Sequence, residues 1–251
     1  MALYTEFETQ GNYLFKHRSN LPIIILILGI ATHLHTQYSG SYLAGSSFEN
    51  AYNFICLIVS FIGLGIRIYT VGHTPDRTSG RNTHEGQVAD SLNTTGIYSM
   101  VRHPLYVGNF FMWLGVGMLT QNPYFILFFT FLYWVYYERI MYAEEQFLSK
   151  KFGEDYHKWA DSTPAFILSF KNFQKPDLSL SIKKVLKKEK DGFLAIFVAF
   201  FIFLGLTNYI QNDNFILDSD VWNILFIVGV SIYIVLKVLK KYTNVFHEVG
   251  R

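Results

Sequence analysis

The sequence predicts an all-α protein, a multi-pass transmembrane helical bundle of about six spans. Half of the residues (51%) are hydrophobic and 18% are aromatic. The apolar residues form long runs, and about 20 apolar residues in a helix cross a bilayer core of roughly 30 Å. Only helices and closed barrels satisfy the backbone in lipid, and these runs lack the period-two alternation of barrel strands. The runs therefore predict helices.

Six apolar runs are long enough to be expected as spans: residues 21–38, 51–71, 105–120, 124–141, 192–210 and 221–239. The first run starts too late for a cleaved signal peptide and is expected to be an uncleaved anchor. The third and fourth runs are separated only by a short turn, which predicts an antiparallel hairpin. Counting about 1.5 Å per residue from that turn places Pro104 and Tyr142 at similar depths. Residues far apart in sequence should therefore meet at the open end of this hairpin.

The positions of the charges predict the orientation. Lys16 and Arg18 precede the first run, Arg102 precedes the third, and ten lysines lie between the fourth and fifth. The three opposite loops, residues 39–50, 121–123 and 211–220, contain no Lys or Arg. The positive-inside rule then places both termini and both long loops in the cytoplasm. We expect a multi-pass protein of a bacterial inner membrane or endoplasmic reticulum membrane, with its active site on the cytoplasmic side.

The chain divides into three regions. These are an N-terminal two-helix membrane region with a cytoplasmic loop (1–89), a core hairpin (90–165), and a basic linker with a C-terminal two-helix membrane region (166–251). Residues 179–190 form a basic amphipathic stretch, typical either of a segment that adheres to anionic lipid or of a solvated loop. The single cysteine, Cys56, excludes a disulfide framework and a cysteine-based zinc site. We expect no metal site and no nucleic-acid partner, and the pattern carries no signal for an oligomeric state.

A first polar cluster precedes and enters the third run. Pro104 suits the first position of a helix, where its missing N–H has no consequence. Arg102 and His103 then lie at a helix N-terminus, where free N–H groups and the dipole favour an anion. The alternative is that Arg102 only marks the inner edge of a span. Tyr106 and Asn109 continue the polarity into the helix, and Asn109 needs a partner within the membrane.

A second polar cluster, containing Tyr142, Glu144 and Glu145, follows the fourth run. Glutamates near a helix C-terminus face the negative end of the dipole, and such locally unfavourable placements are typical of functional sites. Carboxylates beside tyrosine rings suit a bound cation. The alternative for the tyrosines is an aromatic belt at the membrane interface. Together the two clusters match a zwitterionic molecule with a carboxylate and a positive centre, such as S-adenosylmethionine.

An ordered set of motifs spans residues 90–165. It comprises Gly96-x-Tyr98, Arg102-His103-Pro104-x-Tyr106-x-Gly108, the pair Glu144-Glu145, Phe152-Gly153, Tyr156, Trp159 and Pro164. This set resembles the isoprenylcysteine carboxyl methyltransferase and phospholipid methyltransferase superfamily of integral membrane enzymes. The resemblance implies S-adenosylmethionine as the cofactor, bound at the cytoplasmic side, and a lipid or lipidated acceptor that enters from the bilayer.

The resemblance and the two clusters together assign site residues. We expect catalytic roles for Arg102, His103, Glu144 and Glu145. The residues expected to bind the cofactor are Gly96, Tyr98, Arg102, His103, Pro104, Tyr106, Gly108, Asn109, Tyr142, Glu144 and Glu145.

The positive end of the third run favours O-methylation of a carboxylate or phosphate. Such an acceptor is already anionic at neutral pH, whereas an amine has to lose a proton. One alternative is an NADPH-dependent membrane reductase of the sterol type, which resembles this superfamily in fold. The other is a non-enzymatic transporter or assembly factor, which would place charged or broken-helix residues near the middle of the bilayer.

Overall fold

The computed structural model describes residues 2–40, 43, 46, 48–78, 87–217 and 220–250. Its α-helices are α1 (Leu3–Lys16), α2 (Asn20–Tyr38), α3 (Glu49–Gly72), α4 (Pro104–Met118), α5 (Pro123–Phe152), α6 (Glu154–Ser162), α7 (Ile182–Asn212) and α8 (Asp220–Tyr242). Two 3-10 turns, η1 (Ile97–Ser99) and η2 (Phe170–Asn172), lie in the connecting segments. Within the described ranges there is one isolated β-bridge and no strand, so the all-α prediction is confirmed.

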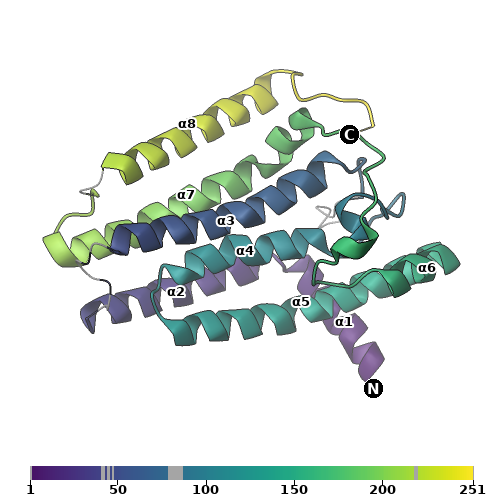
Figure 1. Cartoon of the computed structure of the whole chain (residues 1–251), viewed down its shortest axis with the longest axis horizontal. Coiled ribbons are helices and arrows are strands. Elements are labelled where there is room, and N and C mark those ends of the chain that lie inside the picture. Colours follow the sequence, from purple (N-terminus) through teal and green to yellow (C-terminus); the bar gives the residue numbers. More distant parts are fainter. Residues whose placement is uncertain are drawn as a thin grey trace.

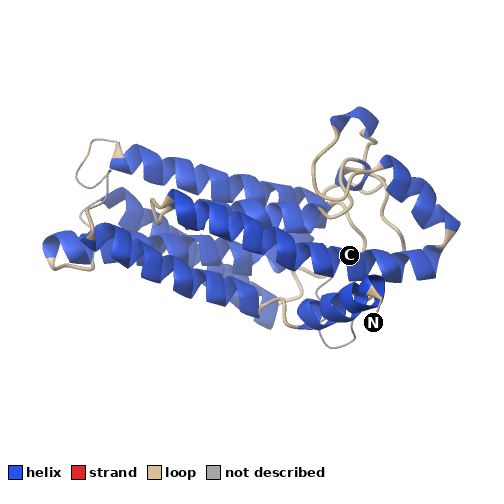
Figure 2. Ribbon diagram, turned by 90° about the horizontal axis from the view of Figure 1, so that it is seen from below, coloured by secondary structure: helices blue, strands red, loops and turns tan. Residues whose placement is uncertain are grey.

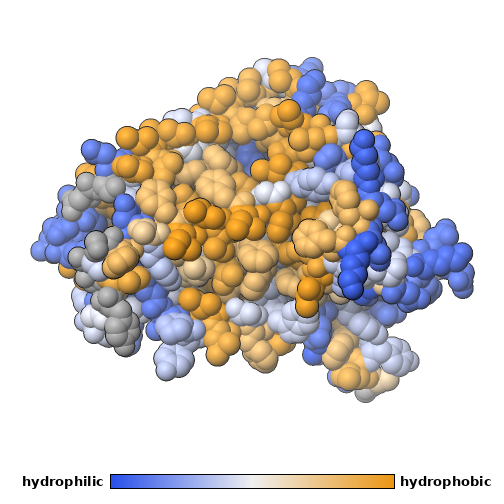
Figure 3. All heavy atoms as spheres, in the orientation of Figure 1, coloured by the Kyte–Doolittle hydropathy of each residue, from blue (hydrophilic) through white to orange (hydrophobic). Residues whose placement is uncertain are grey.

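Four of the described helices, α2, α3, α7 and α8, are long and apolar enough to cross a membrane. The 15-residue α4 is shorter than the others, and α5 carries charges along its second half, so six spans stay a prediction. The helices run side by side, and both termini lie at the same end of the bundle (Figure 1). An apolar surface covers the middle of the bundle, and hydrophilic residues gather toward its ends (Figure 3). This distribution is typical of a membrane-embedded protein.

α3 and α4 pack closely because glycines meet at their crossing. A Cβ atom built on Gly63 would lie 2.4 Å from the carbonyl oxygen of Gly108, and one on Gly108 would lie 2.6 Å from Cγ of Arg67. Ser60 strengthens the contact by donating a hydrogen bond from Oγ to the carbonyl of Met112 at 3.0 Å. Small residues at such a crossing let two backbones approach each other in lipid. Gly108 therefore contributes to helix packing and places Arg67 against α4.

The N-terminal helix α1 is an element that the hydropathy pattern does not predict, since it has no long apolar run. Phe7, Gly11 and Phe15 recur at every fourth position and form one face of the helix. This face packs on α5, where the ring of Phe7 meets Tyr142 edge-on at 5.8 Å and Phe15 is buried. The guanidinium of Arg139 also lies 3.5 Å from the centre of the Phe7 ring. α1 thus covers the part of α5 that lies beyond the apolar run.

At the end of the bundle opposite the termini, His33 connects three helices. Its Nδ1 lies 3.0 Å from the carbonyl oxygen of Leu119, at the end of α4. Its Nε2 lies 2.9 Å from Oγ1 of Thr207 in α7. A buried polar side chain needs such partners, because an unsatisfied polar group in an apolar interior is destabilising. These contacts hold α2 against α7 at this end.

The basic stretch 179–190 is helical from Ile182 on, so it is not the solvated loop that its sequence allowed, and its adhesion to anionic lipid stays a prediction. It forms the connection into α7 and the first turns of that helix, and packs against the end of α3. Ser181 caps the helix by accepting a hydrogen bond from the Lys184 amide at 3.1 Å. The Lys184 side chain is buried, and its Nζ donates to the carbonyls of Thr74 at 2.6 Å and Pro75 at 3.0 Å. These carbonyls satisfy the ammonium group, so this part of the stretch is packed against the protein and is not a solvated loop.

The segment before α4 and the segment after α6 run along each other at the end of the bundle that carries the termini (Figure 2). The Gly96 amide donates to the carbonyl of Gln174 at 3.0 Å, and the Arg102 amide donates to that of Pro164 at 2.9 Å. Gly96 has φ +62, a left-handed conformation that favours glycine, and a Cβ there would lie 3.0 Å from Pro176. The pairing holds the segment before α4 against the segment after α6.

Candidate active site

The α4–α5 hairpin brings the two polar clusters together, as predicted. α4 begins at Pro104, and a short turn leads to α5, where the Asn122 side chain accepts a hydrogen bond from the Phe125 amide at 3.1 Å. At the open end of the hairpin, Nε of Arg102 lies 2.9 Å from Oε1 of Glu145. The two clusters are therefore in direct contact.

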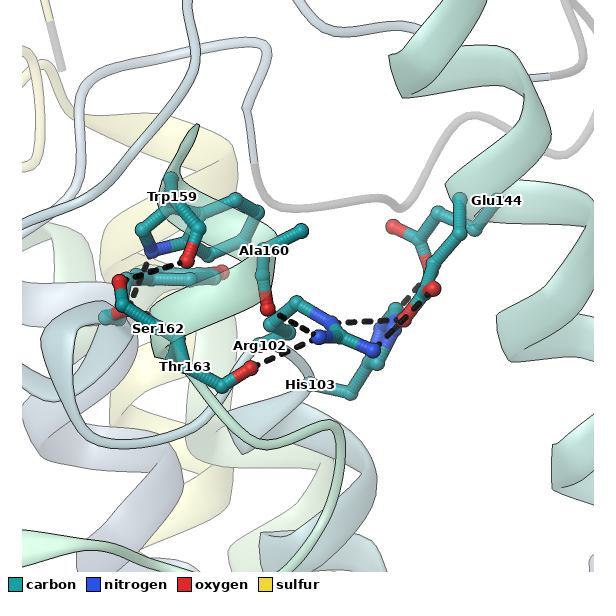
Figure 4. A network of polar contacts seen from close by, with 9 residues as sticks. Arg102, His103, Glu144, Trp159, Ala160, Ser162 and Thr163 are labelled. Carbon is teal, nitrogen blue, oxygen red and sulfur yellow. Dashed lines mark hydrogen bonds and ion pairs between the residues drawn. The ribbon is translucent and has the colours of Figure 1, made fainter. Parts of the chain in front are cut away.

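Arg102 makes side-chain hydrogen bonds to three segments (Figure 4). Its guanidinium donates to both carboxylate oxygens of Glu145, at 2.9 and 3.3 Å. Its Nη1 also donates to the carbonyls of Ala160 in α6 and of Thr163 just after it, each at 2.7 Å. A planar guanidinium suits such two-pronged contacts, and hydrogen bonds between ionised groups are stronger than neutral ones. Arg102 thus fixes the positions of α5 and α6 relative to the start of α4.

The sequence predicted that Arg102 binds the anionic group of a ligand, whereas in the structure it pairs with a carboxylate of the protein itself. The partner is Glu145, and both side chains are largely shielded from solvent, with 18% and 24% of their areas exposed. Shielded charges need compensation, and the nearest opposite charge supplies it. Arg102 is therefore placed to position the surrounding residues.

His103 lies between the two carboxylates, just before the first turn of α4. Its Nε2 is 2.9 Å from Oε1 of Glu145, and its Nδ1 is 3.5 Å from Oε2 of Glu144. Burial by itself would lower the pKa of His103, but the hydrogen bonds and charges of the two glutamates outweigh it and raise the pKa to about 9. Burial opposes ionisation of the glutamates as well, but hydrogen bonds from His103 hold both carboxyl pKa values below the ordinary one. At neutral pH the imidazole is positive and both carboxylates are negative.

Tyr106 continues this network into α4. Its hydroxyl donates to Oε2 of Glu144 at 2.9 Å, and its ring stacks on that of His103 with the ring centres 5.6 Å apart. The Tyr133 hydroxyl donates to the Tyr106 carbonyl at 2.7 Å, which ties this turn of α4 to α5. Tyr106 is therefore held at its side chain and at its backbone.

A small cavity of about 80 Å³ opens beside this network. Its wall includes the carboxylate of Glu144, the imidazole of His103, and the aromatic residues Tyr98 and Trp159. Trp159 is fixed by a hydrogen bond from Nε1 to the carbonyl of Tyr98 at 2.8 Å. The remaining wall comes from α1, the start of α4, the end of α5 and the described residues before Tyr98, including Gln87, Ser91 and Asn93.

A larger cavity of about 480 Å³ lies on the other side of Tyr106. Tyr106 and Leu105 line both cavities. Asn109 lines the larger one, and its Oδ1 accepts a hydrogen bond from Nη1 of Arg67 at 2.7 Å. The partner that the sequence required for Asn109 inside the helix is thus Arg67.

The expected cofactor-binding residues fall into two groups. Tyr98, Arg102, His103, Pro104, Tyr106 and Glu144 line the small cavity, and Glu145 pairs with two of them. Asn109 belongs to the large cavity, Gly108 to the α3–α4 contact, and Gly96 to the pairing with Gln174. Tyr142 lines neither cavity and packs against Phe7. Roles in cofactor binding stay predictions for all of these residues.

Sequence reasoning missed the role of Glu189 and left that of Arg67 open. Arg67 donates from Nε to Oε2 of Glu189 at 2.7 Å and from Nη2 to Oε1 at 2.9 Å. The one available signal was that Glu189 is the only acidic residue within the lysine-rich stretch 183–190. That signal does not identify the partner, which lies 122 positions away.

Comparison with known proteins gives one family match and several relatives. Residues 51–155 match the family model described as phospholipid methyltransferase. The cobalt-zinc-cadmium resistance protein CzcN of Cupriavidus metallidurans is 27% identical over 157 residues, which cover 62% of this chain and 65% of the relative. The protein-S-isoprenylcysteine O-methyltransferase of Schizosaccharomyces pombe is 40% identical over 77 residues, 30% of this chain and 32% of the relative. Protein-S-isoprenylcysteine O-methyltransferase B of Arabidopsis thaliana is 29% identical over 173 residues, 61% of this chain and 87% of the relative.

The matches are partial in length. The chain spans just under two thirds of CzcN and of the nickel-cobalt-cadmium resistance protein NccN of Alcaligenes xylosoxydans, 65% and 66% respectively. No solved structure matches the chain. The family match covers α3 to the start of α6, which includes both polar clusters and the turn between α4 and α5. Over residues 51–155 the chain is therefore similar to phospholipid methyltransferases, and the relatives it matches include protein-S-isoprenylcysteine O-methyltransferases.

Proposed function

We propose that this chain is an S-adenosylmethionine-dependent membrane methyltransferase that methylates an oxygen of an anionic lipid or lipidated acceptor. The match to the phospholipid methyltransferase family model and the isoprenylcysteine O-methyltransferases among its relatives support the reaction type. The charge distribution supports a site at the cytoplasmic surface. The single observation that carries the proposal is the cluster of His103, Glu144 and Tyr106 between the two cavities.

The small cavity has the chemistry that S-adenosylmethionine requires. The Glu144 carboxylate suits an ammonium or sulfonium group, and protonated His103 suits a carboxylate. Tyr98 and Trp159 offer aromatic faces, which favour both a cation and a planar base. A volume of about 80 Å³ is smaller than the roughly 300 Å³ or more of most small-molecule sites, so a nucleoside has to displace part of the wall. The described residues 87–93 form one part of the wall that belongs to no helix.

When bound, S-adenosylmethionine supplies a methyl group on a positively charged sulfur, which a nucleophilic oxygen displaces. The protein's contribution to such a displacement is chiefly positioning and electrostatics. Arg102 holds Glu145 and α6 in place, and Tyr106 and His103 hold Glu144 at the cavity wall. These groups would orient the methyl donor toward the shared wall at Tyr106.

The protonation states favour an acceptor that arrives as an anion. His103 has a pKa of about 9, so at neutral pH it carries a proton and is not available as a base. The lowered pKa values of Glu144 and Glu145 make both carboxylates weak bases. A carboxylate or phosphate needs no deprotonation before it attacks, whereas an ammonium group does. The site thus suits O-methylation.

The test is methyl transfer by the purified protein in lipid nanodiscs. Radioactive methyl-labelled S-adenosylmethionine would be supplied with total lipid extracts and, separately, with a synthetic isoprenylated cysteine. We expect label on an oxygen, released as methanol by mild base from a methyl ester or identified by mass spectrometry on a phosphate. Glu144→Gln should abolish the transfer. Label found only on amines would contradict the proposed acceptor class.

The reductase alternative differs in its cofactor. Isothermal titration of the same preparation with S-adenosylmethionine and with NADPH separates the two functions. We expect heat of binding from S-adenosylmethionine alone. Binding of NADPH without S-adenosylmethionine would replace the methyltransferase proposal with the reductase.

A further inference from the structure

The large cavity has a wall that lies outside the family match. α3, α4 and α5, which contribute Arg67, Tyr106 and Tyr137, belong to the matched residues 51–155. α7 lies beyond them, packs against α3 and is covered on another side by α8 (Figure 1). Its residues at the cavity are Lys188, Glu189, Asp191, Gly192, Ala195 and Ile196. Helix α7 therefore builds part of this cavity.

One end of the cavity is polar and the other is apolar. Arg18, Arg67 and Lys188 contribute three positive charges, and Glu189 and Asp191 contribute two negative ones, so the wall has a net positive charge. The apolar remainder includes Pro22, Met112, Trp113, Val116 and Ile196. A molecule with an anionic group and a hydrocarbon chain matches both ends.

The polar end contains a buried ion pair that joins α3 to α7. Arg67 and Glu189 have 12% and 4% of their side-chain areas exposed, and two hydrogen bonds connect them. Asn109 accepts a third hydrogen bond from the same guanidinium. A guanidinium held on three sides keeps a fixed position in the cavity wall. Glu189 thus sets the position of Arg67 from outside the matched region.

The cavity has a margin on the outer surface of the bundle between α2 and α7. Ser19 at the start of α2, and Asp191 and Ala195 in α7, line the cavity and are exposed. The same two helices are held together at the opposite end by His33 and Thr207. In a membrane, such a lateral opening gives a lipid chain direct access without passage through water.

The cavity also reaches the proposed reaction centre. Tyr106 lines it and donates a hydrogen bond to Glu144, which lines the small cavity. Burial raises the pKa of Glu144, and His103, Tyr106 and then the positive charge of Arg18, in the wall of the large cavity, lower it below the ordinary value. An anionic group at the polar end of the large cavity would therefore lie next to the site proposed for the methyl donor.

We propose that this large cavity is the acceptor site, that it takes an anionic amphiphile, and that α7 determines which acceptor fits. The inference rests on the proposed methyltransferase function and adds to it a location for the acceptor and an element that controls specificity. Gly192 and Ala195 are the α7 positions where added side-chain volume would enter the cavity. A Cβ on Gly192 meets only the flexible end of Met112, at 3.2 Å, and Glu189 Oε2, at 3.8 Å.

The experiment places larger side chains on α7 so that they occupy part of the cavity. Gly192→Leu and, separately, Ala195→Leu would be compared with Gly65→Leu, a matched change on α3 at an exposed position with nothing within 4 Å. The probe is a palmitic acid with a photoreactive diazirine, added to each protein in nanodiscs of neutral lipid. We expect both α7 variants to reduce crosslinking to α7 at least tenfold, with unchanged affinity for S-adenosylmethionine. Gly65→Leu should crosslink as the parent protein does.

Two further measurements separate the possible outcomes. A diazirine amine of the same chain length should crosslink at least tenfold less than the acid, and equal labelling would overturn the assigned charge. Parental crosslinking in folded Gly192→Leu and Ala195→Leu would overturn the assigned site. Crosslinking does not require turnover, so loss of the acid's labelling in these variants supports the cavity even if no methyl transfer is detected. Methyl transfer with unaltered acceptor KM in both variants would overturn this inference and leave the proposed function standing.

Discussion

The guanidinium of Arg102 and the carboxylate of Glu145 are joined by two hydrogen bonds, the shorter of 2.9 Å, across 43 positions of sequence. The pair connects the residue that precedes the His103 cap of α4 with the last turns of α5. Because Arg102 also donates to two carbonyls at the end of α6, the pair supports three segments around the small cavity. Its disruption should affect the cavity wall as well as the stability.

Replacement of Arg102 by lysine should lower both stability and cofactor affinity. A lysine ammonium cannot reproduce the planar set of four hydrogen bonds, and each hydrogen bond to a charged group contributes about 1.5–3 kcal/mol. We expect a lower unfolding temperature in detergent, followed by tryptophan fluorescence, and at least tenfold weaker binding of S-adenosylmethionine by titration. Arg139→Lys is the matched control, since Arg139 pairs with the adjacent Glu138 and lines neither cavity. Equal effects in the two variants would contradict the role given to Arg102.

The stability should depend on pH through His103. Its pKa rises from 6.5 to about 9 in the folded protein, so its contribution is complete below pH 6.5 and is lost as the pH rises through about 9. The pKa values of Glu144 and Glu145 are lowered, so their contribution is present above about pH 4.5 and is lost as the pH falls through the lowered values. Unfolding temperatures measured from pH 4 to 10 should form a plateau near pH 4.5–6.5 and fall toward pH 9. In His103→Asn the alkaline fall should be much smaller.

The hydroxyl of Tyr106 should contribute to turnover. Tyr106→Phe removes the hydrogen bond to Glu144 and keeps the ring that stacks on His103. Loss of one hydrogen bond to a carboxylate, worth about 1.5–3 kcal/mol, predicts a decrease in kcat/KM of roughly ten- to a hundredfold. Tyr142→Phe is the control, because Tyr142 packs on Phe7 and lines neither cavity. A comparable loss in Tyr142→Phe would instead support the cofactor role that the sequence suggested for Tyr142.

The buried pair of Arg67 and Glu189 should show strong coupling in a double-mutant cycle. Arg67→Met or Glu189→Leu alone leaves one buried charge without its partner, which typically destabilises a protein by about 3–5 kcal/mol. The double variant removes both charges and should be much closer to the parent protein. Denaturant unfolding in mixed micelles measures the change in the free energy of unfolding for each single variant and for the double variant. If the changes of the two single variants add up to the change of the double variant, the pair does not hold α3 to α7.

Binding of the cofactor should displace residues 87–93. The small cavity is too small for a nucleoside as it stands, and this segment is a non-helical part of its wall. Hydrogen exchange followed by mass spectrometry should therefore change in peptides covering these residues when S-adenosylmethionine is added. Peptides from α8, which contributes to neither cavity, provide the internal reference. Identical exchange in residues 87–93 with and without bound cofactor would show that the cavity takes the ligand without this movement.

The core hairpin could be predicted because it depends on local properties of the sequence. Pro104 marks the start of one apolar helix, Pro123 the start of the next, and the turn between them is too short for any connection but an antiparallel one. Depth along a helix follows from counting residues, so the meeting of the two polar clusters followed as well, whereas the direct pairing of Arg102 with Glu145 did not. The rotation of α5 about its own axis was harder to predict. Tyr142 faces α1, and α1 is an amphipathic helix without a long apolar run, which the hydropathy pattern does not predict.

The rest of the candidate site depends on contacts between distant helices. No local pattern pairs Arg67 with Glu189, since each residue alone is typical of the charged boundary of a span. Gly108 belongs to a recognisable motif, yet its place in the structure is set by Gly63 on the neighbouring helix. The buried position of Lys184 similarly depends on carbonyl groups at the end of α3. Such pairings emerge only when the packing order of the helices is known.

α5 is one continuous helix from Pro123 to Phe152, and as the fourth predicted span it would set the height of the proposed reacting groups above the bilayer centre. At about 1.5 Å per residue, Glu144 lies roughly 30 Å along the axis from the start of the helix, about the thickness of the hydrocarbon layer. Because the helix is continuous, the Glu144 carboxylate keeps a fixed distance from the apolar residues of the same helix. An acceptor with its tail still among the acyl chains would meet the methyl donor at the level of the headgroups, and lipid extraction into water would be unnecessary.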